Sequence, residues 1–142
     1  MKKIICLTAV VLMVVSVAFA AGKMKIAAKD LPALKGTWTG ILSFGIFEAG
    51  TTSPVTLEIL NDAVPVKAKL TVENVPDQIG KLYGVMSGKN VFENDGGVIT
   101  SQGTLMWTAP DGNVFECAQG EKKLDLWYFF KGLKGEASLK KK

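Results

Sequence analysis

Apolar and polar residues alternate along most of the chain after residue 36, which is the period of half-buried β-strands. The clearest run is Val66–Glu73, in which every even position is apolar and every odd position is polar. Turn-forming clusters such as Asn94–Gly97 and Pro110–Asn113 separate such runs, and an Asp-Gly pair between β-type segments is a strong hairpin signal. The pattern predicts nine strands, at residues 36–47, 53–60, 65–73, 81–88, 97–101, 103–109, 113–119, 122–130 and 132–140, the 97–101 piece being the shortest.

Helical periodicity is almost absent after residue 20, with at most one turn expected at Asp30–Lys35 and another near Val75–Gly80. Eight or nine short strands joined by tight turns form a meander, and a meander protects its edges best by closing on itself. The sequence therefore predicts an all-β domain, an antiparallel meander closed into a small barrel of about eight strands. A two-sheet β-sandwich is the alternative. A barrel of this size is filled by its own side chains or holds one small ligand.

The first twenty residues have the three parts of a secretory signal peptide. Lys2 and Lys3 form a basic head, an apolar stretch covers residues 4–17, and Ala18-Phe19-Ala20 provides small residues for cleavage. The apolar stretch is shorter than the roughly 20 residues of a spanning helix. We therefore expect a signal peptide at 1–20, a flexible leader at 21–30 and a single β-barrel domain at 31–142. The protein should be periplasmic or secreted.

The charge and cysteine content of the chain bear on two properties, a nucleic-acid partner and a disulfide bond. Removal of residues 1–20 leaves 122 residues with 15 lysines, 13 acidic residues and one cysteine, Cys117. An intramolecular disulfide is then impossible, and we expect Cys117 to be buried as a small hydrophobic residue. The lysines do not form a clustered basic face, so a nucleic-acid partner is not expected.

The absence of histidine and arginine limits the chemistry available to the chain. Without histidine there is no Ser-His-Asp triad and no common zinc site, and without arginine there is no bidentate phosphate clamp. The acidic clusters around Asp95 and Asp111 match turn chemistry and not a calcium-binding loop. We therefore expect no enzymatic activity, no catalytic residues, no cofactor and no metal site.

Aromatic residues are the remaining candidates for a binding site. The predicted lining of a barrel ligand site consists of aromatic residues from four predicted strands: Trp38, Phe44, Tyr83, Trp107 and Tyr128. The segment Leu126–Phe130 is apolar on both faces, which indicates that its outer face is covered as well. Trp127 and Phe129 are therefore the candidates for an exposed contact patch.

The segment Asp30–Trp38 resembles the opening of the calycins, the group that contains lipocalins, fatty-acid-binding proteins and avidins. Leu34, Gly36 and Trp38 match a short helical turn followed by a Gly-x-Trp strand. The resemblance covers this opening and the strand meander. It implies a lipocalin-like barrel with a small ligand inside. It also implies that a basic residue from the final strand packs on the tryptophan, which would be Lys131 or Lys134 here.

Three functions remain open from the sequence. The first is an exported, non-enzymatic protein that binds a small apolar or amphipathic ligand in its barrel. The second is an envelope protein-interaction module or inhibitor that acts through its outer surface. The third is a small outer-membrane barrel, but the 66–73 strand would send Lys67, Lys69 and Glu73 toward lipid. We therefore expect no stable membrane insertion.

Overall fold

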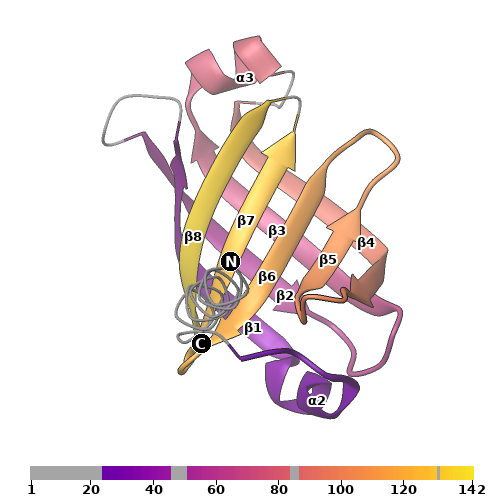
Figure 1. Cartoon of the computed structure of the whole chain (residues 1–142). Coiled ribbons are helices and arrows are strands. Elements are labelled where there is room, and N and C mark those ends of the chain that lie inside the picture. The colour runs from indigo at the N-terminus through magenta and orange to yellow at the C-terminus, as the bar shows by residue number, and fades with distance from the viewer. Residues whose placement is uncertain (1–23, 46–50, 84–86, 131) are drawn as a thin grey trace, which may run out of the picture.

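Eight antiparallel strands close into a barrel in the computed structural model, which describes residues 24–45, 51–83, 87–130 and 132–142 (Figure 1). The strands are β1 (Gly36–Phe44), β2 (Thr52–Ile59), β3 (Val66–Val75), β4 (Gly88–Ile99), β5 (Leu105–Thr108), β6 (Val114–Gly120), β7 (Lys123–Phe130) and β8 (Leu133–Lys141). Each strand pairs with the next along the chain, and β8 closes the barrel by pairing with β1. The predicted all-β barrel is confirmed, and the β-sandwich alternative is wrong.

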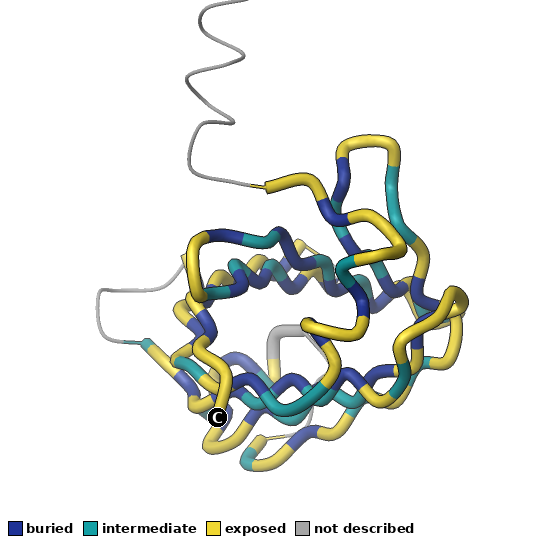
Figure 2. The backbone as a smooth tube through the Cα atoms, turned by 90° about the horizontal axis from the view of Figure 1, so that it is seen from below, coloured by how far each residue is buried: buried dark blue, intermediate teal, exposed yellow. Residues whose placement is uncertain are grey.

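The alternation seen in the sequence corresponds to the alternation of buried and more exposed residues along the strands of the barrel wall (Figure 2). In β3, Val66, Ala68, Leu70 and Val72 are buried, whereas Lys67 points outward. Burying a large apolar side chain stabilises the fold by about 1.5–3 kcal/mol. One hydrophobic core takes buried apolar residues from seven of the eight strands, and the partly buried Phe92 and Ile99 of β4 pack against it.

The strand predicted at residues 81–88 is wrong. This region begins within a helix, α3 (Asp77–Tyr83), and β4 starts only at Gly88. Pro76 starts the helix, because its carbonyl oxygen accepts hydrogen bonds from the backbone N–H groups of Ile79 (3.0 Å) and Gly80 (3.2 Å). The helical turn expected near 75–80 is thus confirmed. Neither α3 nor another helix in the described residues is long and apolar enough to span a membrane.

The turn predicted at Asn94–Gly97 is also wrong, because these residues lie inside β4. Val66 pairs with Gly97 and Ala68 pairs with Asn94, so β4 carries one extra residue opposite β3. This arrangement is a β-bulge, and turn-forming residues are common at bulges. The Oδ1 atom of Asn94 accepts a hydrogen bond from the Gly96 N–H at 2.8 Å. The predicted 97–101 strand is therefore the end of β4.

The end of the barrel opposite α3 is crossed by a short helical segment, η1 (Ala28–Asp30) followed by α2 (Leu31–Leu34) (Figure 2). This segment confirms the helical turn expected at Asp30–Lys35, and its residues Leu31 and Leu34 are fully buried. The described part of the predicted flexible leader, residues 24–30, packs against the barrel. Met24 forms a bridge to Gln119, and Ile26 is buried. These residues cover the wall where β6 extends past β5.

Candidate functional site

Trp38 closes the α2 end of the barrel. Its indole N–H donates a hydrogen bond to the carbonyl oxygen of Leu34 at 2.8 Å, and only 6% of the residue is exposed. Lys141 of β8 places its Nζ atom 5.8 Å from the centre of the Trp38 ring and donates a hydrogen bond to the carbonyl oxygen of Ala33 at 2.8 Å. Trp38 therefore holds the last strand against α2.

Lys141 fills the role that the calycin resemblance implies for a basic residue of the final strand. The expectation that Lys134 would fill it is wrong, because Lys134 lies at the other end of β8 and pairs with Glu136 at 3.0 Å. Lys131 lies outside the described residues. The two-residue repeat of β8 explains this choice of lysine. It places Lys141 in the same register as the buried Leu139, whereas Lys140 lies in the outward register.

Trp107 is packed into the core. It is fully buried, and its ring stacks on Phe115 with the ring centres 5.0 Å apart. Its indole N–H donates a hydrogen bond to the carbonyl oxygen of Val66 at 2.9 Å. Neither Trp38 nor Trp107 belongs to the wall of the cavity at the α3 end of the barrel.

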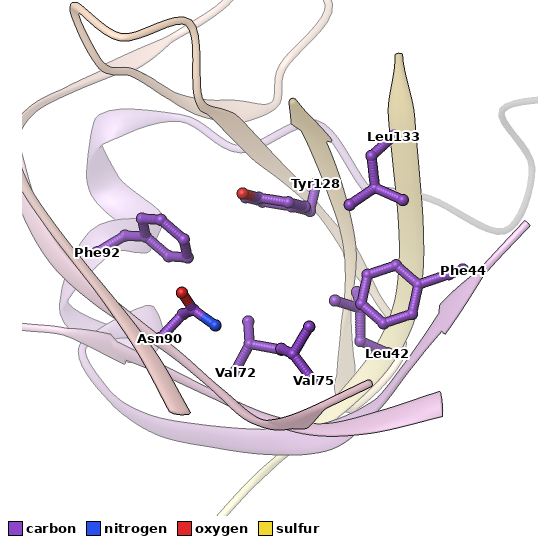
Figure 3. Close-up of a pocket in the computed structure, with 8 residues that line it drawn as sticks. All are labelled: Leu42, Phe44, Val72, Val75, Asn90, Phe92, Tyr128 and Leu133. Atoms are coloured by element: carbon purple, nitrogen blue, oxygen red, sulfur yellow. The ribbon is translucent and has the colours of Figure 1, made fainter. Parts of the chain in front are cut away.

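The α3-end cavity is the unfilled space between side chains of β1, β3, β4, β7 and β8 (Figure 3). Its wall is formed by Leu42, Phe44, Val72, Val75, Asn90, Phe92, Tyr128 and Leu133. Two of the five residues predicted to line a ligand site, Phe44 and Tyr128, thus come together here. Tyr83 is the last residue of α3, and its side chain lies outside the described part of the chain.

Several wall residues were missed by the sequence reasoning. Leu42 and Val72 lie in the inward register of predicted strands, and the alternation pattern itself could have found them. Asn90 and Phe92 were missed because the residues around Gly88 read as a turn, whereas β4 begins there. The inward position of Asn90 could not be recognised without the correct start of this strand.

The α3-end cavity is small. Its volume is about 10 Å³, which is room for about one water molecule. Cavities that hold drug-sized ligands typically measure about 300–1,000 Å³. A ligand of several heavy atoms can therefore occupy this end only if side chains of the wall move apart.

A hydrogen-bonded chain leads from the surface to this cavity. The Tyr128 hydroxyl donates to Oδ1 of Asn113 at 2.5 Å, and Nδ2 of Asn113 donates to Oδ2 of Asp111 at 2.6 Å. Burial raises the pKa of Tyr128, and the negative charge of Asp111 raises it further. The phenol therefore keeps its proton at a pH where a free tyrosine would lose it.

Buried polar side chains are unevenly distributed along the barrel. Those in the described residues are Ser53, Asn90 and Asn113. Ser53 lies near the start of β2, Asn90 near the start of β4 and Asn113 just before β6, and all three positions are at the α3 end. The α2 half of the described core is apolar apart from its tryptophan N–H groups.

The outer groove is a second concave surface, on the outside of β1, β7 and β8. It measures about 430 Å³ and is lined by Ile41, Ser43, Asp125, Leu126, Trp127, Glu136, Ala137 and Ser138. Trp127 is half-buried in it, and Ile41 is 55% exposed. Phe129 is 38% exposed on the same face of β7 but does not line the groove.

The other reactive groups offer little chemistry. Within the described residues, no three His, Cys, Asp or Glu side chains gather where they could hold a metal ion. Cys117 is fully buried, and burial raises the pKa of its thiol, with Glu116 adding to the effect. Because the thiolate is the nucleophilic form, this cysteine is inert in the folded protein.

The fold defines the class of the protein as an eight-stranded antiparallel β-barrel, an architecture consistent with the calycin resemblance. Comparison of the chain with protein-family models, with curated proteins and with solved structures finds no significant match in any of the three. The case for a function therefore depends on the two concave surfaces of the barrel.

Proposed function

We propose that this chain is an exported, non-enzymatic protein that holds a small apolar or amphipathic molecule at the α3 end of its barrel. The observation that carries the proposal is the concentration of buried polar side chains at this one end, together with a cavity there whose wall is apolar apart from Asn90 and Tyr128. Ligand sites commonly combine an apolar wall with a few polar groups, and the mouths of β-barrels are frequent locations.

The energetic cost of this arrangement supports a functional role. Burying polar groups is unfavourable unless they are hydrogen-bonded, and a fully apolar end would avoid that cost. The Asp111–Asn113–Tyr128 chain satisfies its polar atoms through one another, and no described buried side-chain nitrogen or oxygen lacks a hydrogen-bond partner. Tyr128 is the member of this chain that lines the cavity, and its hydrogen bond to Asn113 fixes the position of its hydroxyl.

The two ends of the barrel differ in a way that favours the α3 end for binding. The α2 end is sealed by Leu31, Leu34 and the hydrogen bonds of Trp38 and Lys141. The α3 end contains unfilled space and is covered by a helix of seven residues, of which Ile79 is fully buried (Figure 1). Since the unfilled space admits about one water molecule, binding requires the wall at this end to open.

An NMR titration tests the proposal. A panel of amphipathic molecules of six to ten heavy atoms is added to the exported chain labelled with ¹⁵N. We expect concentration-dependent shifts at the amides of Val72, Asn90 and Leu133 and none at Leu31 or Leu34. The proposal fails if no member of the panel moves the first group at millimolar concentration, or if the shifts occur elsewhere.

The outer groove favours a second function, that of an envelope protein-interaction module or inhibitor. Its volume and its mixture of Trp127, Ile41 and polar side chains are the supporting observation. Capture of partners from an envelope extract tests it with Trp127→Ala. The matched control is Val98→Ala, which removes an exposed residue of β4 (44% exposed). Equal capture by both variants and the parent would eliminate the groove as a partner site.

A further inference from the structure

The direction of the hydrogen bonds around Tyr128 is set by Asp111. An ionised carboxylate only accepts hydrogen bonds, and Asp111 accepts one from the backbone N–H of Asn113 (3.0 Å) and one from its Nδ2 atom (2.6 Å). The side-chain nitrogen of Asn113 is thereby committed to Asp111, and its Oδ1 atom faces Tyr128. Because an amide oxygen only accepts, Tyr128 donates its single proton to Asn113.

This direction decides what the α3-end cavity offers to a ligand. A phenol that has donated its proton retains lone-pair capacity on its oxygen. Figure 3 shows the ring of Tyr128 extending across the cavity with its hydroxyl toward the Phe92 side. The cavity is therefore presented with a hydrogen-bond acceptor at this position. Asn90 is the other polar side chain of the wall, and it already takes part in an interaction of its own.

We infer that the α3-end cavity selects molecules that carry a hydrogen-bond donor, such as an alcohol hydroxyl, on an otherwise apolar body. The inference rests on the proposed function and names the ligand class for the same site. A ligand whose only polar atom is an acceptor would set lone pairs against the Tyr128 oxygen and could form no hydrogen bond with it. Such a mismatch in a desolvated site costs about tenfold in affinity.

The isomers 1-hexanol and methyl pentyl ether provide the direct test. They contain the same atoms in unbranched chains of equal length, but only the alcohol has a hydrogen-bond donor. Both are titrated into the exported chain, and the amides of Val72 and Leu133 are followed by NMR. We expect both isomers to move these amides, with 1-hexanol binding roughly tenfold more tightly.

Two variants connect the preference to the hydrogen-bonded chain. Tyr128→Phe keeps the ring and removes the oxygen, so the ratio of affinities should fall to within about twofold. Asp111→Asn removes the acceptor-only group at the exposed end of the chain and lets Asn113 turn over, so the preference should weaken. Asp95→Asn, at an exposed acid of β4, is the matched control and should leave the ratio unchanged.

The outcomes separate the inference from the proposed function. Equal binding of both isomers at the α3-end cavity, or an alcohol preference that persists in Tyr128→Phe, overturns the inference and leaves the binding site standing. Failure of both isomers to move the amides of the cavity wall contradicts the proposed function, and the inference falls with it.

Discussion

Substitution of Gly97 by alanine should destabilise the barrel strongly, because this glycine makes room for Trp107. A Cβ atom at Gly97 would lie 2.7 Å from Cε2 of Trp107 and 2.7 Å from the carbonyl oxygen of Val66, and still closer to Nε1 of the indole. These contacts are too short to exist, and one of the three atoms is backbone. The indole would have to move away from Val66, its hydrogen-bond acceptor at 2.9 Å.

The magnitude of the destabilisation follows from two costs and one smaller opposing gain. Overpacking of a well-filled core costs about 1–3 kcal/mol, and a buried N–H that loses its acceptor costs about 1–3 kcal/mol more. The reduced freedom of the unfolded chain returns at most about 1 kcal/mol. We therefore expect Gly97→Ala to lower the free energy of unfolding by about 2–4 kcal/mol. For a domain of this size the melting temperature should fall by roughly 10 °C.

The neighbouring glycine provides the matched control. A Cβ atom at Gly96 would lie 3.4 Å from Oδ1 of Asn94, an ordinary contact, so Gly96→Ala should change the free energy of unfolding by less than about 0.5 kcal/mol. Urea unfolding followed by tryptophan fluorescence measures both variants. In a Trp107→Phe background the cost of Gly97→Ala should shrink by about 1–2 kcal/mol. Equal stability of the two alanine variants would refute the reasoning.

Three further predictions concern the contacts of Lys141 with Trp38 and Ala33 and the two buried ionisable groups. Lys141→Met should lower the free energy of unfolding by about 1 kcal/mol, because it removes a hydrogen bond and a cation–π contact. Lys140→Met should leave the free energy of unfolding unchanged, and equal urea midpoints of the two variants would contradict this expectation. The pKa of Tyr128 is raised in the folded protein, so the hydroxyl keeps its proton there, whereas the unfolded chain loses that proton near pH 10. The free energy of unfolding should therefore fall as pH rises above about 10. In a Tyr83→Phe variant, phenolate absorbance should appear only on unfolding, and a titration near pH 10 in the folded state would contradict this. Cys117 should react with a thiol reagent only in denaturant, and rapid reaction of the native protein would show that the thiol is accessible.

Most of the barrel was predictable because its strands obey the two-residue period. The alternation in Val66–Glu73 identified β3, and the similar run from Leu133 identified β8. The errors occurred where local residue preference and position in the barrel disagree. The segment Asn94–Gly97 contains turn-forming residues but forms a bulge in β4. A glycine is needed at position 97 because a side chain there would clash with Trp107, 10 residues further along the chain.

The candidate site was less predictable than the fold. Trp38, Trp107 and Tyr128 all point inward, but the sequence contains no signal for the height at which each lies along the barrel axis. Height depends on the stagger of the strands, which brings Phe44 and Tyr128 to one end and Trp38 to the other. The chain from Asp111 to Tyr128 joins positions 17 residues apart, and it becomes visible only once β6 and β7 are paired.

Native mass spectrometry is the sharpest test of whether the exported barrel holds a small molecule at its α3 end. The protein is purified without detergent from the envelope fraction of its own host. We expect a chain that begins at Ala21 and carries a stoichiometric extra mass. This mass should be released on denaturation and lost in Val72→Phe, a variant that fills the cavity. A bare protein mass, together with no binding in the NMR titration, would contradict the claim and leave the outer groove as the functional surface.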